Sequence, residues 1–330
     1  MRLQAATELL DAGVSDGLWP GVVAAVGTGD DIEQTWVRGS ADTLSGRAMT
    51  VDTVFDLASL TKVMATLPAV LGLPVPLSAK LREFVPGVDE RITVEHALTH
   101  TSGLPAHVRF TATTPDDLVA AAAQVPVETP PGTRVVYSDL GFVLLGGAVA
   151  AVTGLGLDAA VQRDVIAPLG LACRFRPPSS WHDRIAATEI YDGVATLGVV
   201  HDENAQAAGG VAGHAGLFGT LADVIGSLPP WLHADAAHRD AMRDRTAGPG
   251  GNRGLGWTCR GDGYDILSAG WGPHAVSHTG FTGTSMALDP DTGRWAVLLT
   301  NHVHYGRGRP EVFAARRRWH AVLVGDQPAS

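Results

Sequence analysis

The chain has 330 residues, of which 45% are hydrophobic and 18% are charged, and its formal net charge is -10. That length suits one large domain or two interleaved domains with a substantial buried core. The negative charge argues against nucleic acid or an anionic membrane as a partner, because both require clustered lysine and arginine. The basic run Arg316–Arg318 falls in a helical pattern, and we expect it to be a solvated helix face.

The N-terminal residues contain no uninterrupted apolar run behind a basic segment, so we expect no signal peptide. No stretch of the sequence is long and apolar enough to span a bilayer. The two cysteines, Cys173 and Cys259, lack metal-ligand spacing and are expected to be reduced thiols. These features together predict a cytoplasmic protein.

The first predicted elements are a helix, a hairpin and a series of helices. Residues 3–12 have an amphipathic helical pattern, and the strand-like runs 22–27 and 32–39 follow with Gly and Asp between them. Residues 59–72 are apolar on most faces, which indicates a buried helix. Further helical patterns lie at residues 93–99, 115–124, 139–153 and 158–168.

The C-terminal third of the chain is rich in strands. A strong turn signal, Pro290-Asp291-Thr292-Gly293, separates two of them. A final helix is expected after the last strand. The predicted elements are strands at 275–278, 284–289 and 294–300, and a helix from about 311 to 323.

The order of strands, then helices, then strands predicts an α+β fold. The simplest packing places both ends of the chain in one antiparallel sheet flanked by helices. We therefore expect residues 1–70 and 241–330 to form a discontinuous sheet domain. Residues 71–240 would form a mostly helical inserted domain, with the active site in the cleft between the two.

Lysine is rare in this chain, which has only Lys62 and Lys80. A desolvated lysine can lose its proton near neutral pH, whereas arginine cannot. Ser59 lies three residues before Lys62, so on the first turn of a helix its hydroxyl and the amine share a face. This spacing predicts a serine nucleophile beside a neutral amine base. The alternative is a helix-capping serine followed by a solvent-facing lysine.

Two further segments strengthen the catalytic interpretation. Tyr137-Ser138-Asp139 follows a Pro/Gly turn and precedes an apolar helix, so its phenol can face a nucleophile. His278-Thr279-Gly280 ends a predicted strand, where glycine lets the backbone approach a substrate closely. The backbone amides of Ser59 and Phe281 could then stabilise an oxyanion.

The three motifs, in this order and spacing, resemble those of the serine β-lactamase and penicillin-binding-protein superfamily. The middle motif starts with a tyrosine, and in this respect the chain resembles the class C branch. Many esterases and peptidases of that branch carry His-Thr-Gly as the third motif. The resemblance covers about residues 18–320. The supporting runs are Leu98–Leu104, Pro131-Gly132, Pro168–Leu171 and Gly213–Phe218, with His201–Ala205 and Leu299–His304 closest to amidase- and carboxypeptidase-like members.

The resemblance implies a role for each motif residue. Ser59 would be acylated, Lys62 would be held neutral or share a proton to deprotonate it, and Tyr137 would shuttle protons and activate water. His278 would lie on the edge strand and orient the substrate, while the amides of Ser59 and Phe281 would form the oxyanion hole. Thr279, Gly280 and Asp139 would complete the substrate-binding residues.

Two residues depart from the motifs of many relatives. Asp139 stands where many have Asn, and an ionised aspartate accepts hydrogen bonds but cannot donate them as an amide does. This weakens recognition of an amide side chain. His278 replaces a lysine, which removes a permanent cation and weakens binding of a substrate carboxylate at neutral pH.

The sequence predicts a serine hydrolase that forms an acyl-enzyme on a small ester or amide, as an esterase, amidase or D-amino-acid peptidase. One alternative is a transacylase that passes the acyl group to an amine or alcohol, and another is a non-catalytic acyl-sensing or scaffold protein. His100, His201 and His214 have no zinc-ligand spacing despite the nearby Asp202 and Glu203, so no metal is expected. No cofactor is implied. The oligomeric state and the role of residues 201–204 stay open.

Overall fold

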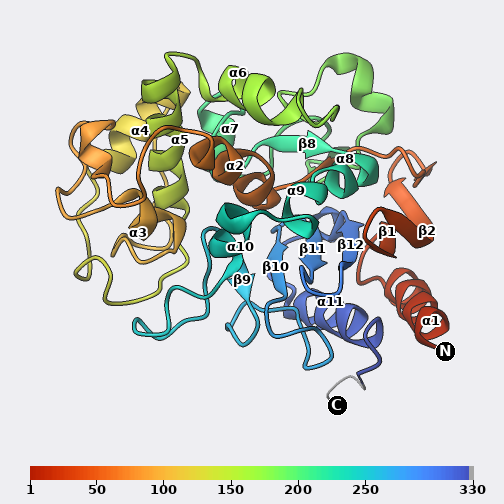
Figure 1. Ribbon diagram of the computed structural model, residues 1–330. Coiled ribbons are helices and arrows are strands. Elements are labelled where there is room, and N and C mark those ends of the chain that lie inside the picture. The colour runs from red at the N-terminus through yellow and green to blue at the C-terminus, as the bar shows by residue number, and fades with distance from the viewer. Residues whose placement is uncertain (327–330) are drawn as a thin grey trace.

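The computed structural model describes residues 1–326 and is built around a seven-stranded sheet (Figure 1). The strand order is β3-β2-β1-β12-β11-β10-β9, and neighbouring strands pair antiparallel. The predicted α+β fold with an antiparallel sheet is therefore confirmed. The strands are β1 Gly21–Thr28, β2 Asp31–Asp42, β3 Arg47–Ala48, β9 Thr258–Cys259, β10 Val276–Thr279, β11 Ser285–Leu288 and β12 Arg294–Thr300.

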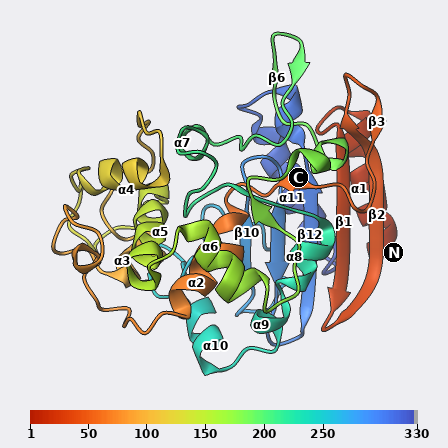
Figure 2. The same ribbon diagram turned by 90° about the horizontal axis from the view of Figure 1, so that it is seen from above.

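Helices flank this sheet, and most of them lie in the sequence between its two halves. Figure 2 shows α3, α4 and α5 grouped to one side of the sheet. The helices are α1 Arg2–Ser15, α2 Leu67–Leu71, α3 Val94–Leu98, α4 Pro115–Ala123, α5 Asp139–Thr153, α6 Leu157–Val161, α7 Glu203–Ala207, α8 Leu221–Gly226, α9 Pro229–Leu232, α10 Ala236–Met242 and α11 Pro310–Val322.

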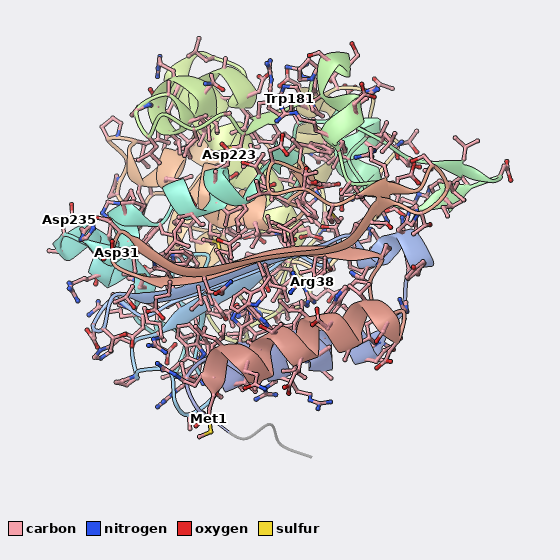
Figure 3. All side chains as sticks on the ribbon, turned by 90° about the vertical axis from the view of Figure 1, so that its right-hand side faces the viewer. Met1, Asp31, Arg38, Trp181, Asp223 and Asp235 are labelled. Carbon is pink, nitrogen blue, oxygen red and sulfur yellow. The ribbon has the colours of Figure 1, made fainter. Side chains whose placement is uncertain are left out.

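The two faces of the sheet carry separate cores, because successive side chains of a strand point to opposite faces. On β1, Val22, Ala24 and Val26 belong to the core that α1 and α11 cover, whereas Val23 and Ala25 belong to the larger core on the other face. Figure 3 shows α1 lying along one side of β1 and β2, with most of the helices on the opposite side. The sheet is thus buried on both faces.

The helices and strands predicted from sequence periodicity are confirmed, most within a few residues of their expected bounds. The helix expected at 59–72 contains a π-helical turn at Lys62–Thr66, a feature that often marks functional sites. Several short elements were not predicted. They include α7 to α10 and a small sheet in which Phe55 pairs with Gly219, a residue far away in the sequence. Such elements owe their stability to distant contacts and have no periodic pattern of their own.

The strands of the seven-stranded sheet lie within the terminal ranges 1–70 and 241–330. β1 from the first range pairs with β12 from the second along its whole length, so the ends of the chain meet at the centre of the sheet. α8, from the range 71–240, packs against both of these strands. The division into two domains at these boundaries stays a prediction.

α5 is the most apolar of the longer helices, and Gly154 ends it in a left-handed conformation with φ +69°. Within residues 1–326, no single helix is both long and apolar enough to cross a membrane. The bent pair Asp139–Thr153 and Leu157–Ile166, with 76° between its parts, passes that test by length and composition only. α5 begins at Asp139, so its N-terminus places a carboxylate at the pocket described below.

Leu298 lies at the centre of β12 and is fully buried, whereas Leu44 is 52% exposed. We expect Leu298→Ala to lower the free energy of unfolding by about 3 kcal/mol, because it leaves a cavity between the sheet and the helices that cover it. The matched change Leu44→Ala should cost less than about 1 kcal/mol. Urea unfolding of both variants measures this difference, and equal losses would contradict the assigned core.

Candidate active site

Ser59 lies at the start of a buried helix, on a turn that follows the short strand β4 (Phe55–Asp56). Ala58, just before it, has φ +47°, a left-handed conformation that costs energy for a residue with a side chain. The Asp56 carboxylate stabilises this turn by accepting a hydrogen bond from the Ala58 N–H at 2.8 Å. The turn presents Ser59 to a pocket of about 440 Å³.

The structure brings the predicted site residues together. Lys62 lies fully buried beneath the pocket and donates to the Ser59 Oγ at 2.9 Å. The remaining predicted side chains and backbone come from α5, β10 and the loops beside them. Ser59, Tyr137, Asp139, His278, Thr279, Gly280 and Phe281 all line this one pocket.

The Lys62 amine has three acceptors, which matches the three N–H bonds of an ammonium. Besides Ser59, its Nζ donates to Asp139 Oδ1 at 2.8 Å and to the backbone oxygen of His214 at 3.2 Å. Burial lowers the pKa of Lys62, but the Asp139 carboxylate and the Tyr137 oxygen raise it more, and the net shift is upward. The neutral amine expected from the sequence is therefore not the resting state, because Asp139 holds the charge.

Tyr137 is packed among rings and cations. The His100 ring lies on it with centroids 4.4 Å apart, while Lys62 Nζ and the Arg253 guanidinium lie 5.0 and 5.4 Å from its centroid. His100 has φ +57°, and its Nδ1 accepts a hydrogen bond from the Ser138 N–H at 3.1 Å. His100 and Arg253 thus position the phenol. The sequence interpretation missed both, since neither belongs to a local pattern with Tyr137.

Two residues that line the pocket have backbone amides without acceptors. Among residues 1–326, neither the Ser59 nor the Phe281 N–H has a hydrogen-bond partner. The loop that holds Phe281 is bound to β4, because the Thr282 hydroxyl donates to the Asp56 carbonyl at 2.7 Å. At Gly280, an added Cβ would lie 2.8 Å from a backbone oxygen of the segment before Ser59. This close approach keeps the Gly280 backbone against the segment that precedes Ser59.

His278 does not bring a charge to the pocket. It is buried at the end of β10, and its Nδ1 lies 3.0 Å from the Thr279 carbonyl oxygen. Burial, followed by repulsion from Lys62 and Arg253, places the pKa of His278 well below its ordinary value. The loss of a permanent cation at this motif, expected from the sequence, is consistent with this neutral ring.

Arg316 supplies a cation that the sequence interpretation missed. It is only 6% exposed, lines the pocket, and donates through Nη1 to the Gly280 and Thr284 carbonyls at 2.9 and 3.0 Å. No carboxylate in the described part of the chain forms a salt bridge with it. Burial lowers its pKa to about 10, which still leaves it charged at neutral pH. The expectation of a solvated helix face is wrong for Arg316, whose position four residues after the buried Val312 was the available signal.

Two residues considered as metal ligands lie beside Asp139. Asp139, Asp202 and His214 each offer one ligand atom, and these atoms lie within 4.8 Å of one another. His214 Nε2 lies 2.8 Å from Asp202 Oδ1, and although burial raises the pKa of Asp202, His214 lowers it to about 2. The Lys62 ammonium is already bonded to Asp139. The positive charge beside the Asp139 carboxylate is therefore that of the Lys62 ammonium.

Residues 6–318 match the family model described as Beta-lactamase. A putative D-alanyl-D-alanine carboxypeptidase of Escherichia coli (strain K12) is 30% identical over an alignment of length 314, which covers 77% of this chain and 70% of that protein. Two solved structures share the fold. EstCE1, a hydrolase with promiscuous acyltransferase activity, has a TM-score of 0.79, 20% identity and 98% coverage of both chains. A class C beta lactamase from Rhodobacter sphaeroides has a TM-score of 0.74 and 20% identity, covering 96% of this chain and 97% of its own.

The ion pair between Lys62 and Asp139 predicts a shifted pH profile in Asp139→Asn. Without the carboxylate, burial dominates and lowers the pKa of Lys62, so a neutral amine forms at lower pH. The rising limb of kcat/KM against pH should move to lower pH by about one unit or more, measured with an activated ester. Asp164→Asn, which removes an exposed carboxylate paired with Arg163, should leave the profile unchanged. An unmoved limb in Asp139→Asn would contradict control of the amine by this carboxylate.

Proposed function

This chain belongs to the β-lactamase family and is a serine hydrolase acting through an acyl-enzyme, and we propose that Ser59 is its nucleophile. The observation that carries the proposal is the 2.9 Å contact between Ser59 Oγ and Lys62 Nζ at the floor of the pocket. The unbonded amides of Ser59 and Phe281 support it, because their N–H groups can donate hydrogen bonds to the oxyanion that forms from the attacked carbonyl.

Lys62 and Tyr137 act as a pair with one transferable proton between them, either as ammonium and phenolate or as amine and phenol. Ser59 Oγ attacks the carbonyl carbon, and its proton passes through Lys62 to Tyr137. The resulting oxyanion is held by the two amides. When the intermediate collapses, the bond to the leaving group breaks and Tyr137 delivers the proton to it.

Deacylation reverses these roles. A water molecule attacks the acyl carbon, Tyr137 accepts its proton, and Ser59 regains a proton as the acid leaves. An amine or alcohol in place of water would give a transacylase, which one structural neighbour supports by its name. The non-catalytic alternative is less favoured, since the contact between Ser59 and Lys62 and the two unbonded amides support catalysis.

Among hydrolases, we favour a peptidase that removes a residue with a free carboxylate. Arg316 supports this choice, because it lines the pocket with no carboxylate partner among the described residues and can bind an anionic leaving group. It thereby replaces the charge that the neutral His278 lacks. The relative from Escherichia coli carries a carboxypeptidase name. The cytoplasmic location and the lack of nucleic-acid or membrane partners stay predictions.

Acylation should depend on both members of the first motif. After mixing with a small activated ester, the intact mass of the wild type should increase by one acyl group or the ester should turn over. Both effects should vanish in Ser59→Ala. Lys62→Arg should be nearly as inactive, because arginine cannot give up a proton to act as a base. Substantial turnover by Lys62→Arg would contradict the proton relay, and amide product in the presence of added amine would favour the transacylase.

Arg316 should select substrates by charge. For a short peptide with a free C-terminal carboxylate and the same peptide as its C-terminal amide, the ratio of kcat/KM should fall about tenfold in Arg316→Gln. Arg316→Lys should keep part of the preference. Loss of the contacts with Gly280 and Thr284 would affect both substrates alike, so the ratio isolates the leaving-group contact. An unchanged ratio would remove Arg316 from substrate binding.

A further inference from the structure

Phe281 carries an exposed aromatic ring into the same pocket as Ser59. The structure describes all eight phenylalanines of the chain, and Phe281, which is 54% exposed, is the one that is not at least partly buried. It lines the pocket of about 440 Å³ together with Ser59. An exposed aromatic side chain in a pocket of this size is typical of a binding site, because packing a ligand against the ring removes apolar surface from water.

The Phe281 ring is supported by residues that are themselves held in place. The His201 ring stacks on it, with 5.5 Å between the centroids and 20° between the ring planes. The Arg307 guanidinium lies 5.9 Å from the centroid of the Phe281 ring. Glu189 and Glu203 each accept a hydrogen bond from Arg307. Two residues of the segment that begins at His201, whose role the sequence left open, thus help to fix the position of this ring.

The backbone of Phe281 determines which part of a substrate meets the ring. In the proposed function, the Phe281 N–H donates to the oxyanion that forms from the scissile carbonyl. The side chain begins two covalent bonds from that nitrogen, so groups attached to the carbonyl carbon lie close to it. The turn that carries Phe281 is closed by a hydrogen bond of 3.1 Å from the Gly283 N–H to the Gly280 carbonyl. The group that covers the exposed part of the ring therefore belongs to the substrate.

We propose that the side chain of Phe281 binds an aromatic ring that the substrate carries next to its scissile carbonyl. This inference rests on the proposed function and names a chemical group of its substrate. Aromatic rings that stack with an offset or meet edge to face attract each other beyond the gain from their buried area. Tyr264, which is 58% exposed and lines the same pocket, offers a second ring to such a group. The aromatic ring can belong to the acyl group or to the leaving group, and the test distinguishes the two.

The test compares three activated thioesters. S-ethyl thioacetate is the reference, its phenylacetyl counterpart carries a phenyl ring on the acyl group, and S-benzyl thioacetate carries one on the leaving group. Thiol release reports acylation of Ser59, and its kcat/KM for each aromatic thioester is expressed as a ratio to the reference in the same enzyme. At least one ratio should fall about tenfold in Phe281→Ala, whereas Phe281→Tyr, which keeps the ring, should retain it. A lower ratio for the phenylacetyl compound assigns the aromatic ring to the acyl group, and a lower ratio for the benzyl compound assigns it to the leaving group.

Any disturbance of the Phe281 amide acts on all three thioesters, so the ratios isolate the ring. Tyr305→Ala is the matched control, because Tyr305 is 46% exposed and lies 6.1 Å from the His304 ring and 5.9 Å from the Arg309 guanidinium, but does not line the pocket. It should change neither ratio. Wild-type values of both ratios in Phe281→Ala would overturn the aromatic site and leave the proposed function standing. If the wild type releases no thiol from any of the three compounds, the proposed function fails, and this inference fails with it.

Discussion

The site depends on a lysine ammonium that is completely removed from solvent. An unpaired buried charge costs several kcal/mol, so Lys62 requires partners in fixed positions. These partners come from three parts of the chain: Ser59 on the same helix, Asp139 at the start of α5, and the His214 carbonyl between α7 and β8. The neighbouring Thr66 hydroxyl binds the Gly213 carbonyl at 2.6 Å and joins the same segments again. The position of the Ser59 hydroxyl is therefore set by the hydrogen bonds that the buried Lys62 ammonium requires.

The same ion pair determines where the proton resides. Asp139 raises the pKa of Lys62, so in the proposed mechanism the lysine and the tyrosine accept the serine proton together rather than a free amine. The cations of Lys62 and Arg253 lie 5.0 and 5.4 Å from the Tyr137 ring centroid, so two positive charges surround this ring. His278, which is neutral, contributes no such charge. Arg253 is itself held by two hydrogen bonds to Asp262, so its position is rigid.

Local patterns were enough to predict most helices and strands. The three-residue spacing of Ser59 and Lys62 was enough to predict that their side chains meet. Local patterns were not enough to predict contacts between distant residues. Lys62 and Asp139 are 77 positions apart, and nothing in either segment marks the other as its ion partner. The sequence therefore indicated the amine but not the carboxylate that raises its pKa. Arg316 is different, because its four-residue spacing from the buried Val312 placed it on the inner face of α11. For Arg316, the general expectation that a basic run is solvated was given more weight than the helical periodicity, which predicts burial.

Reaction and substrate selection reside in different parts of this chain. In the proposed mechanism the three motifs supply the nucleophile, the proton relay and the oxyanion amides, all of which can act on any ester or amide carbonyl. The charges that can distinguish substrates come mainly from outside the motifs, with Arg316 on α11 and Asp202 before α7 lining one pocket. Asp139 lines the same pocket, but one of its oxygens holds the lysine. Under the proposed mechanism a change at Asp139 therefore alters the proton relay itself, whereas a change at Arg316 acts on the choice of substrate and on the Gly280 backbone that it holds.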